Sequence, residues 1–178
     1  MQNDVVCAGF GGQGVLLIGK VLAYAGMQAG KEVSWIPSYG PEMRGGTANC
    51  VVNISDEPIS SPVASNYDVA AVLNLPSLKR FEPRIKEGGI LIWESTIIKE
   101  APTRNDIQIY GLPAISKATH EFKNTKVMNM ILLGALVKIN GIVKKDSVLI
   151  ALKDTLPERH HHLIPLNEQA IEMGMNLV

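Results

Sequence analysis

The chain has 178 residues, of which 46% are hydrophobic and 19% are charged. A chain of this length forms one domain that buries roughly 70% of its unfolded surface, so residues 1–178 are expected to fold without a disulfide or a structural metal. Its 17 basic and 17 acidic residues cancel. This balance removes the electrostatic argument for nucleic acid or an anionic membrane surface as a main partner.

The two cysteines, Cys7 and Cys50, each lie in an apolar segment and are far apart in the sequence. No C-x-x-C spacing occurs, so we expect no iron–sulfur cluster and no metal site on this chain. Both are interpreted as buried thiols in a reducing compartment. Met1 leads into a predicted strand without a signal-peptide pattern, and no apolar run reaches 18 residues. The sequence thus predicts a cytoplasmic protein without a membrane span.

The first feature in chain order is a burst of glycines between two apolar runs. Residues 5–20 read VVCAGFGGQGVLLIGK, which predicts a strand, a tight turn and a helix. Gly9, Gly11 and Gly14 have the spacing G-x-G-x-x-G, which permits a sharp turn, close approach of a ligand, and packing of helix on strand. Free N–H groups at the start of the helix favour a phosphate or a carboxylate. The candidate cofactor-binding residues of this glycine loop are Gly9, Gly11, Gly12, Gln13 and Gly14.

The second predicted strand, residues 32–39, lacks the acidic residue that a dinucleotide site requires. A carboxylate ~20 residues beyond the glycines, at the end of that strand, binds the ribose hydroxyls. Here the strand ends in Pro37-Ser38-Tyr39, and Glu32 lies at its beginning, on the opposite edge of the sheet. Three interpretations stay open: a bound dinucleotide, a different anion, or a glycine turn that serves close packing.

The rest of the chain alternates predicted strands and helices. Strand patterns cover residues 47–55, 68–75, 89–94 and 107–112, with a short extended piece at 59–61. Helical patterns cover residues 14–29, 77–86, 113–122, 127–139, 146–156 and 166–173. Pro83 should kink or split the second of these helices. Asp146 or Ser147 should cap the fifth, and Gly174 should end the last.

The helices at 14–29 and 127–139 carry very few polar side chains. A surface helix normally has a polar half. These two must therefore be covered on most sides, either by other parts of the chain or by a second chain.

The alternation predicts an α/β fold, a three-layer Rossmann-like domain with a mainly parallel sheet and right-handed crossovers. The glycine loop follows the first strand and the loop at 39–46 follows the second. Both should therefore lie along the carboxyl edge of the sheet, and a switch point between them would form one crevice.

The loop at 39–46 carries the second candidate site. Glu42 and Arg44 flank Met43, between Pro41 and a pair of glycines. Arg44 is suited to bind a carboxylate or a phosphate, with Glu42 fixing its orientation. The alternative is an ion pair that shapes the loop or docks another chain. The candidates for an interface or anion contact are Tyr39, Glu42, Arg44, Gly45 and Gly46.

No complete catalytic set can be assembled from the sequence. The triplet His160 to His162 cannot point one way on a helix or strand and is interpreted as solvated surface. His120 and Glu121 lack an identified nucleophile, and Asn129 is interpreted as a capping or buried hydrogen-bonding residue. We therefore expect no catalytic residues on this chain and interpret it as one part of a larger enzyme.

The two loops together carry a family resemblance. Residues 9–14, read GFGGQG, and residues 38–49, read SYGPEMRGGTAN, resemble the gamma subunits of the 2-oxoacid:ferredoxin oxidoreductases. The likeness continues through residues 60–62, Asp68 and its strand, Asn129 in its apolar helix, and residues 167–174. It runs the length of the chain, so residues 1–178 look like a single pyruvate/ketoisovalerate ferredoxin oxidoreductase gamma-type domain.

The resemblance implies a subunit of a complex with alpha and beta catalytic chains and, in some members, a ferredoxin-like delta chain. Such complexes oxidatively decarboxylate a 2-oxoacid, form an acyl-CoA and reduce ferredoxin. The expected cofactors of the complex are thiamine diphosphate, Mg, iron–sulfur clusters and coenzyme A, with none bound firmly by this chain. The gamma-type domain is implicated in coenzyme A binding, so the glycine loop could meet CoA phosphates, with Glu42 and Arg44 at or near the interface with the catalytic chains.

The loop at 39–46 looks most like the 2-oxoglutarate type, which implies conversion of 2-oxoglutarate to succinyl-CoA. The branched-chain 2-oxoacid and pyruvate enzymes remain alternatives. Two interpretations of other classes also stay open: a stand-alone module that binds NAD or FAD at the glycine loop, and a structural domain that self-associates through the apolar helices near Val15 and Met130.

Overall fold

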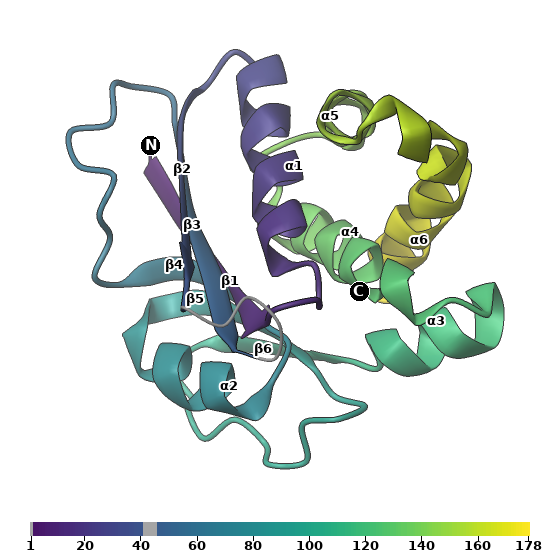
Figure 1. Cartoon of the computed structure of the whole chain (residues 1–178). Coiled ribbons are helices and arrows are strands. Elements are labelled where there is room, and N and C mark those ends of the chain that lie inside the picture. Colours follow the sequence, from purple (N-terminus) through teal and green to yellow (C-terminus); the bar gives the residue numbers. More distant parts are fainter. Residues whose placement is uncertain (1, 41–45) are drawn as a thin grey trace.

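The computed structural model describes residues 2–40 and 46–178, which form an α/β domain around one six-stranded sheet (Figure 1). The strand order is β2-β3-β1-β4-β5-β6. Strands β1, β4, β5 and β6 are mutually parallel, and β3 runs antiparallel to both β2 and β1. The strands are β1 (Gln2–Phe10), β2 (Glu32–Tyr39), β3 (Thr47–Ser55), β4 (Tyr67–Val72), β5 (Ile85–Glu94) and β6 (Gln108–Leu112). The predicted mainly parallel α/β sheet is therefore confirmed.

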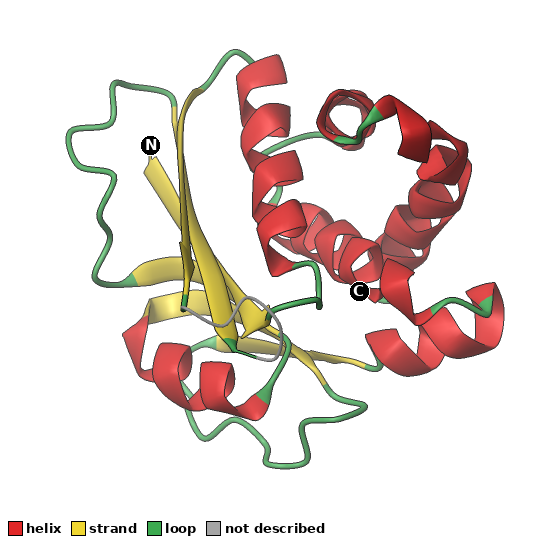
Figure 2. Ribbon diagram, in the orientation of Figure 1, coloured by secondary structure: helices red, strands yellow, loops and turns green. Residues whose placement is uncertain are grey.

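The helices form an uneven pair of layers around the sheet (Figure 2). Helices α1, α4, α5 and α6 gather on one face, whereas α2 lies against the other (Figure 1). The α-helices are α1 (Val15–Gln28), α2 (Leu75–Phe81), α3 (Ala114–Phe122), α4 (Met128–Asn140), α5 (Lys145–Thr155) and α6 (Ile164–Asn176). Short 3₁₀ helices are η1 (Glu82–Arg84), η2 (Thr125–Val127) and η3 (Glu158–Leu163). Alternation along β1 supplies both cores, since Val5 and Cys7 face the larger layer and Val6 and Ala8 face α2.

The two apolar helices are covered by the chain itself. Helix α1 packs against β2, β3 and α5, and α4 packs against α3, α6 and the sheet. Every residue from Met128 to Val137 is buried. Val15 and Met130 are 2% and 1% exposed and do not themselves form a surface for a second chain, whereas Tyr24 and Met27 of α1 stay exposed. Self-association of the chain therefore stays a prediction.

Helices α4 and α6 cross with backbones almost in contact. A Cβ atom on Gly174 would lie 1.8 Å from the carbonyl oxygen of Ile131, and one on Gly134 would lie 2.0 Å from that of Ile171. Only glycine fits at either position, because real Cβ atoms do not approach a backbone oxygen so closely. Gly174 lies inside α6, which continues to Asn176, so its predicted role as the end of that helix is wrong.

Most other predicted elements are present, with small corrections. The helix after β4 ends at Phe81 and continues as the 3₁₀ turn η1 at Pro83, as expected from the proline. Helix α5 begins at Lys145 with Lys144 at the N-cap position and no side-chain cap, so the predicted caps Asp146 and Ser147 lie within the first turn instead. Residues 59–61 form no strand.

Candidate functional site

The glycine loop joins β1 to α1 as the sequence predicts. Gly12 and Gly14 have positive φ values of 97° and 78°, and Gly14 is the N-cap residue of α1. Left-handed backbone of this kind favours glycine. Gly9 lies within β1 and is needed for space, because a Cβ there would lie 2.6 Å from Gln13 Oε1 and 2.9 Å from Val15 Cγ1. The glycines therefore serve turn geometry and close packing at once.

The side chain of Gln13 turns back and fastens this loop to the sheet. Its Oε1 accepts a hydrogen bond from the amide of Phe10 at 2.6 Å, and its Nε2 donates to the carbonyl of Leu73 at 3.2 Å. It thus bridges the carboxyl ends of β1 and β4, where the strand order reverses and where a Rossmann-type ligand would lie. Both polar ends of Gln13 are used within the protein, so it shapes the loop and does not present its amide to a ligand.

Asn129, in the first turn of α4, contacts the glycine loop. It is 5% exposed, and its Nδ2 lies 3.5 Å from the carbonyl oxygen of Gly14. A Cβ on Gly14 would lie 2.3 Å from the same nitrogen. Asn129 is therefore a buried hydrogen-bonding residue, and it fixes the N-cap of α1 against α4.

Four amide groups around the start of α1 are not used in hydrogen bonds within the described parts of the chain. Gly11 N donates to Gly46 O at 2.8 Å, and Gln13 N donates to Phe10 O at 3.1 Å. Within the described parts of the chain, no hydrogen-bond partner is present for the remaining loop and first-turn amides, which are those of Gly12, Gly14, Val15 and Leu16. Unpaired N–H groups at a helix N-terminus attract phosphate or carboxylate.

A cavity of about 350 Å³ opens beside these amides. We call it the loop pocket. Its walls are mainly apolar and bring the glycine loop, the first turn of α1, the end of β2 and the start of β3 together. The lining residues are Phe10, Gly11, Gly12, Gly14, Val15, Leu16, Leu17, Tyr39 and Ala48. An apolar wall beside free amides suits a ligand that has both an anionic and an apolar part.

The second candidate loop is described only in part. Tyr39 lines the loop pocket and is 56% exposed, and Gly46 contributes the carbonyl that accepts from Gly11. The predicted contacts of Glu42, Arg44 and Gly45 fall on positions outside the described residues.

Glu94, which the sequence interpretation missed, is a fully buried carboxylate at the end of β5. Its Oε1 accepts from the amide of Ile115 at 3.0 Å, and its Oε2 accepts from that of Ile97 at 2.9 Å. It caps the first turn of α3 from a distance, since the N-cap residue Pro113 makes no side-chain bond. Its two oxygens are thereby used for structure.

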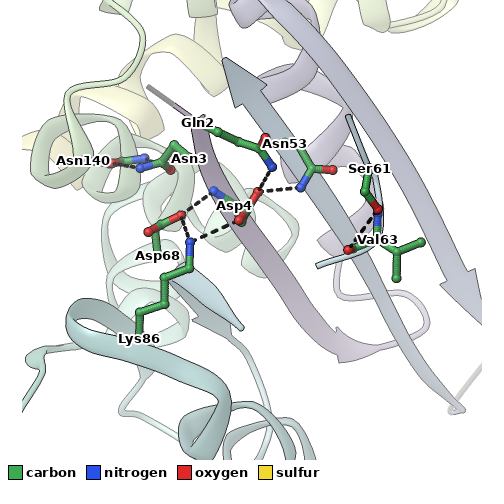
Figure 3. A network of polar contacts seen from close by, with 9 residues as sticks. All are labelled: Gln2, Asn3, Asp4, Asn53, Ser61, Val63, Asp68, Lys86 and Asn140. Atoms are coloured by element: carbon green, nitrogen blue, oxygen red, sulfur yellow. Dashed lines mark hydrogen bonds and ion pairs between the residues drawn. The ribbon is translucent and has the colours of Figure 1, made fainter. Parts of the chain in front are cut away.

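A cluster of charged and polar side chains lies around the first residues of β1, at the end of that strand opposite to the glycine loop (Figure 3). Lys86 Nζ contacts Asp4 at 3.1 Å and Asp68 at 2.8 Å, and Asn53 Nδ2 donates to Asp4 at 2.7 Å. Burial opposes ionisation of Asp4, but hydrogen bonds from Gln2, Asn53 and Lys86 outweigh it and lower the pKa of Asp4 below its ordinary value. This group ties strands β1, β3, β4 and β5 together.

The remaining titratable candidates do not converge on one site. His120 and Glu121 are exposed at the end of α3, and the histidines His160 to His162 lie in η3. Among the described residues, no group of three or more His, Cys, Asp or Glu side chains is arranged to hold a metal ion. The same residues include no helix long and apolar enough to cross a membrane.

Comparison with known proteins shows that this chain matches a known family. A family model described as pyruvate ferredoxin/flavodoxin oxidoreductase matches residues 4–177. The 2-oxoglutarate synthase subunit KorC of Methanocaldococcus jannaschii is 36% identical over 160 residues, which cover 89% of this chain and 86% of that protein. The ketoisovalerate oxidoreductase subunit VorA of Methanothermobacter thermautotrophicus is 36% identical over 171 residues. That match covers 96% of this chain but only 35% of VorA, so the chain spans about a third of that relative.

Solved structures have the same fold. The gamma subunit of a keto/oxoacid ferredoxin oxidoreductase from Geobacter sulfurreducens matches with a TM-score of 0.84 and 30% identity, covering 98% of this chain and 97% of that one. A 2-oxoglutarate:ferredoxin oxidoreductase from Magnetococcus marinus, solved with 2-oxoglutarate, coenzyme A and succinyl-CoA, matches with a TM-score of 0.88. Its identity of 24% shows the fold alone, and this chain covers 31% of it.

Proposed function

The chain belongs to the pyruvate ferredoxin/flavodoxin oxidoreductase family, and from that premise we propose that it is the gamma subunit of a multi-subunit 2-oxoacid:ferredoxin oxidoreductase. The family match over residues 4–177, the similarity to KorC over most of both chains and the shared fold with a gamma subunit from Geobacter sulfurreducens support this proposal. Its partners are alpha and beta chains, which hold thiamine diphosphate, Mg and iron–sulfur clusters, and ferredoxin accepts the electrons. Where some iron–sulfur clusters are carried by a separate chain, that chain is a ferredoxin-like delta subunit.

The observation that carries a role in coenzyme A binding is the loop pocket. Coenzyme A has phosphates at one end and a long, mostly uncharged arm at the other. The four unpaired amides of the glycine loop and first turn suit a phosphate, and the adjoining wall formed by Leu16, Leu17 and Tyr39 suits the arm. In this proposal Gly11, Gly12 and Gly14 contact the ligand, while Gly9 and Gln13 hold the loop in shape.

For the substrate we propose 2-oxoglutarate, which would be converted to succinyl-CoA. The similarity to KorC over most of both chains supports this choice. The similarity to VorA, which has the same identity, supports a branched-chain 2-oxoacid equally well. The pocket for the 2-oxoacid would lie on the partner chains, so an assay must decide.

Affinity isolation on this chain from the source cells, without oxygen, tests the assignment. We expect larger chains that carry thiamine diphosphate and iron–sulfur to co-purify with electron transfer dependent on a 2-oxoacid, CoA and ferredoxin. Parallel assays with 2-oxoglutarate, 2-oxoisovalerate and pyruvate then identify the substrate. Recovery of the chain alone or only with copies of itself would overturn the subunit proposal, and NAD binding by the lone chain would favour the nucleotide-binding alternative.

A further inference from the structure

The register of the sheet brings the two cysteines together. Cys7 of β1 lies directly opposite Cys50 of β3 in the antiparallel pair. Both side chains are completely buried on the face that packs against α1, and both are free thiols. Side chains directly opposite in such a pair have Cβ atoms about 4.5–5.5 Å apart, and a disulfide requires about 3.5–4.5 Å. A shift of about 1 Å therefore suffices to join them.

One thiol of the pair is hydrogen-bonded to the start of α1. Cys7 and Cys50 lie on the same face of the sheet, directly opposite each other. Cys50 Sγ donates to the carbonyl oxygen of Val15, the first residue of α1, at 3.4 Å. This contact is close because Gly19 has no side chain, and a Cβ there would lie 2.3 Å from Cys50 Sγ.

The two thiols lie next to residues that line the loop pocket. Val15, whose carbonyl accepts from Cys50, lines that pocket, and so does Ala48, two residues before Cys50 on the same face of β3. Val15 and Ala48 thus lie between the fully buried thiols and the cavity.

The surroundings of Cys50 favour its anion over that of Cys7. The neighbouring thiol of Cys7 lowers the pKa of Cys50, whereas the neighbouring Cys50 together with burial raises the pKa of Cys7. The indole Nε1 of Trp35 is buried with no hydrogen-bond partner among the described residues, and it borders Gly19 beside Cys50. A thiolate or an oxidised sulfur at Cys50 would accept that unused N–H.

We propose that Cys7 and Cys50 are an oxidation site, a dithiol that a peroxide converts to an intramolecular disulfide. In this reaction the sulfur of Cys50 attacks the peroxide O–O bond, and its thiol proton leaves with the first water as a sulfenic acid forms. Cys7 then attacks that sulfur, an S–S bond forms, and the hydroxyl departs with the Cys7 proton as a second water. Two thiols lose two electrons in total, and one hydrogen peroxide is reduced to two waters.

Oxidation would change a hydrogen bond at the start of α1, next to the glycine loop. In the disulfide, Cys50 has no proton to donate, so the bond to the carbonyl of Val15 is lost. Because Val15 both begins α1 and lines the loop pocket, the change occurs at the candidate ligand site. The pair thereby couples the oxidation state of the chain to the pocket.

The test treats the folded full chain, prepared without oxygen, with hydrogen peroxide and then blocks remaining thiols with iodoacetamide under denaturing conditions. We expect complete loss of both reactive thiols, a peptide pair that joins Cys7 to Cys50 by mass spectrometry, and a rate independent of protein concentration. Hydrogen exchange of residues 11–18 should be faster in the oxidised chain than in the reduced one.

Matched variants separate the native pairing from random oxidation. Cys7→Ala should stop at a dimedone-reactive sulfenic acid on Cys50, whereas Cys50→Ala should leave Cys7 reduced for longer than either thiol of the wild type. Persistence of both thiols in the folded wild type, or disulfides only between chains, would overturn the proposal without reliance on any variant. Unchanged hydrogen exchange at residues 11–18 after clean disulfide formation would overturn the coupling to the loop pocket.

Discussion

Replacement of Gly14 by alanine probes the contact that holds the glycine loop on the rest of the domain. The φ of +78° costs a residue with a Cβ about 1–2 kcal/mol. The new Cβ would also lie 2.3 Å from Asn129 Nδ2 and 3.0 Å from its Cγ, so the buried amide must move away from the Gly14 carbonyl. A buried polar group left unpaired costs about 1–3 kcal/mol. We therefore expect Gly14→Ala to lower the free energy of unfolding by about 2–5 kcal/mol.

Gly141 provides a matched control for this substitution. It has a φ of +68° at the end of α4, and an added Cβ meets nothing within 4 Å. Gly141→Ala should therefore cost only the backbone term of about 1–2 kcal/mol. Urea denaturation followed by circular dichroism measures both values.

A double-mutant cycle isolates the steric term. Asn129→Ala should lower the free energy of unfolding of the wild type substantially. In the chain that already carries Gly14→Ala the same substitution should lower it much less, because it also removes the amide atoms that clash with the new Cβ. Equal costs for Gly14→Ala and Gly141→Ala, or strictly additive effects in the cycle, would refute the reasoning.

Three further substitutions test the crossing of α4 and α6, the hydrogen bonds of Glu94 and the ionisation of Asp4. Gly174→Ala should destabilise the chain by about 3 kcal/mol or more, because its Cβ would meet the backbone of Ile131 at 1.8 Å, and a melting temperature equal to that of the wild type would contradict the α4–α6 crossing. Glu94→Ala should cost about 3 kcal/mol in urea denaturation because two amides lose their acceptor, with Glu94→Gln less affected; equal values for the two would argue against the capping role. The pKa of Asp4 is lowered in the folded state, so its contribution is present above the ordinary value of 3.8 and is lost as the pH falls below it. Asp4→Asn should therefore flatten the loss of stability in acid, and unfolding curves at several pH values that are parallel for both proteins would contradict this.

Local patterns predicted the elements of the fold well, because apolar runs and turn residues determine them locally. The bounds of β2 and β3 agree with the predicted residues 32–39 and 47–55. The direction of β3 was not predicted, although the sequence contains the reason. Only seven residues join β2 to β3, which is too short for the crossover that parallel neighbours require.

Features that depend on contacts between distant segments were beyond local patterns. A glycine near the end of a helical pattern is equally consistent with a C-cap and with a helix contact, and only the position of Ile131 decides for Gly174. The pairing of Cys7 with Cys50 depends on the strand register in the same way. A crevice between the glycine loop and the loop at 39–46 was expected, and the glycine loop and Tyr39 both line the loop pocket. The expected switch point between these two loops is wrong, because the strand order reverses between β1 and β4, where Gln13 forms an unpredicted bridge.

The measurement that tests the central proposal most directly is the KM for coenzyme A of the complex that carries Leu16→Glu on this chain. Leu16 lines the loop pocket, and a glutamate in the first turn of α1 is compatible with the helix dipole, so the fold should be kept. Met27→Glu adds the same charge about 16 Å further along the helix, at a side chain that is 60% exposed.

We expect Leu16→Glu to raise the KM for coenzyme A about tenfold, equivalent to about 1.4 kcal/mol, through repulsion of its phosphates, and to leave the KM for the 2-oxoacid unchanged. Met27→Glu should change neither constant. A KM for coenzyme A that is the same in both variants and the wild type would contradict a CoA-facing loop pocket.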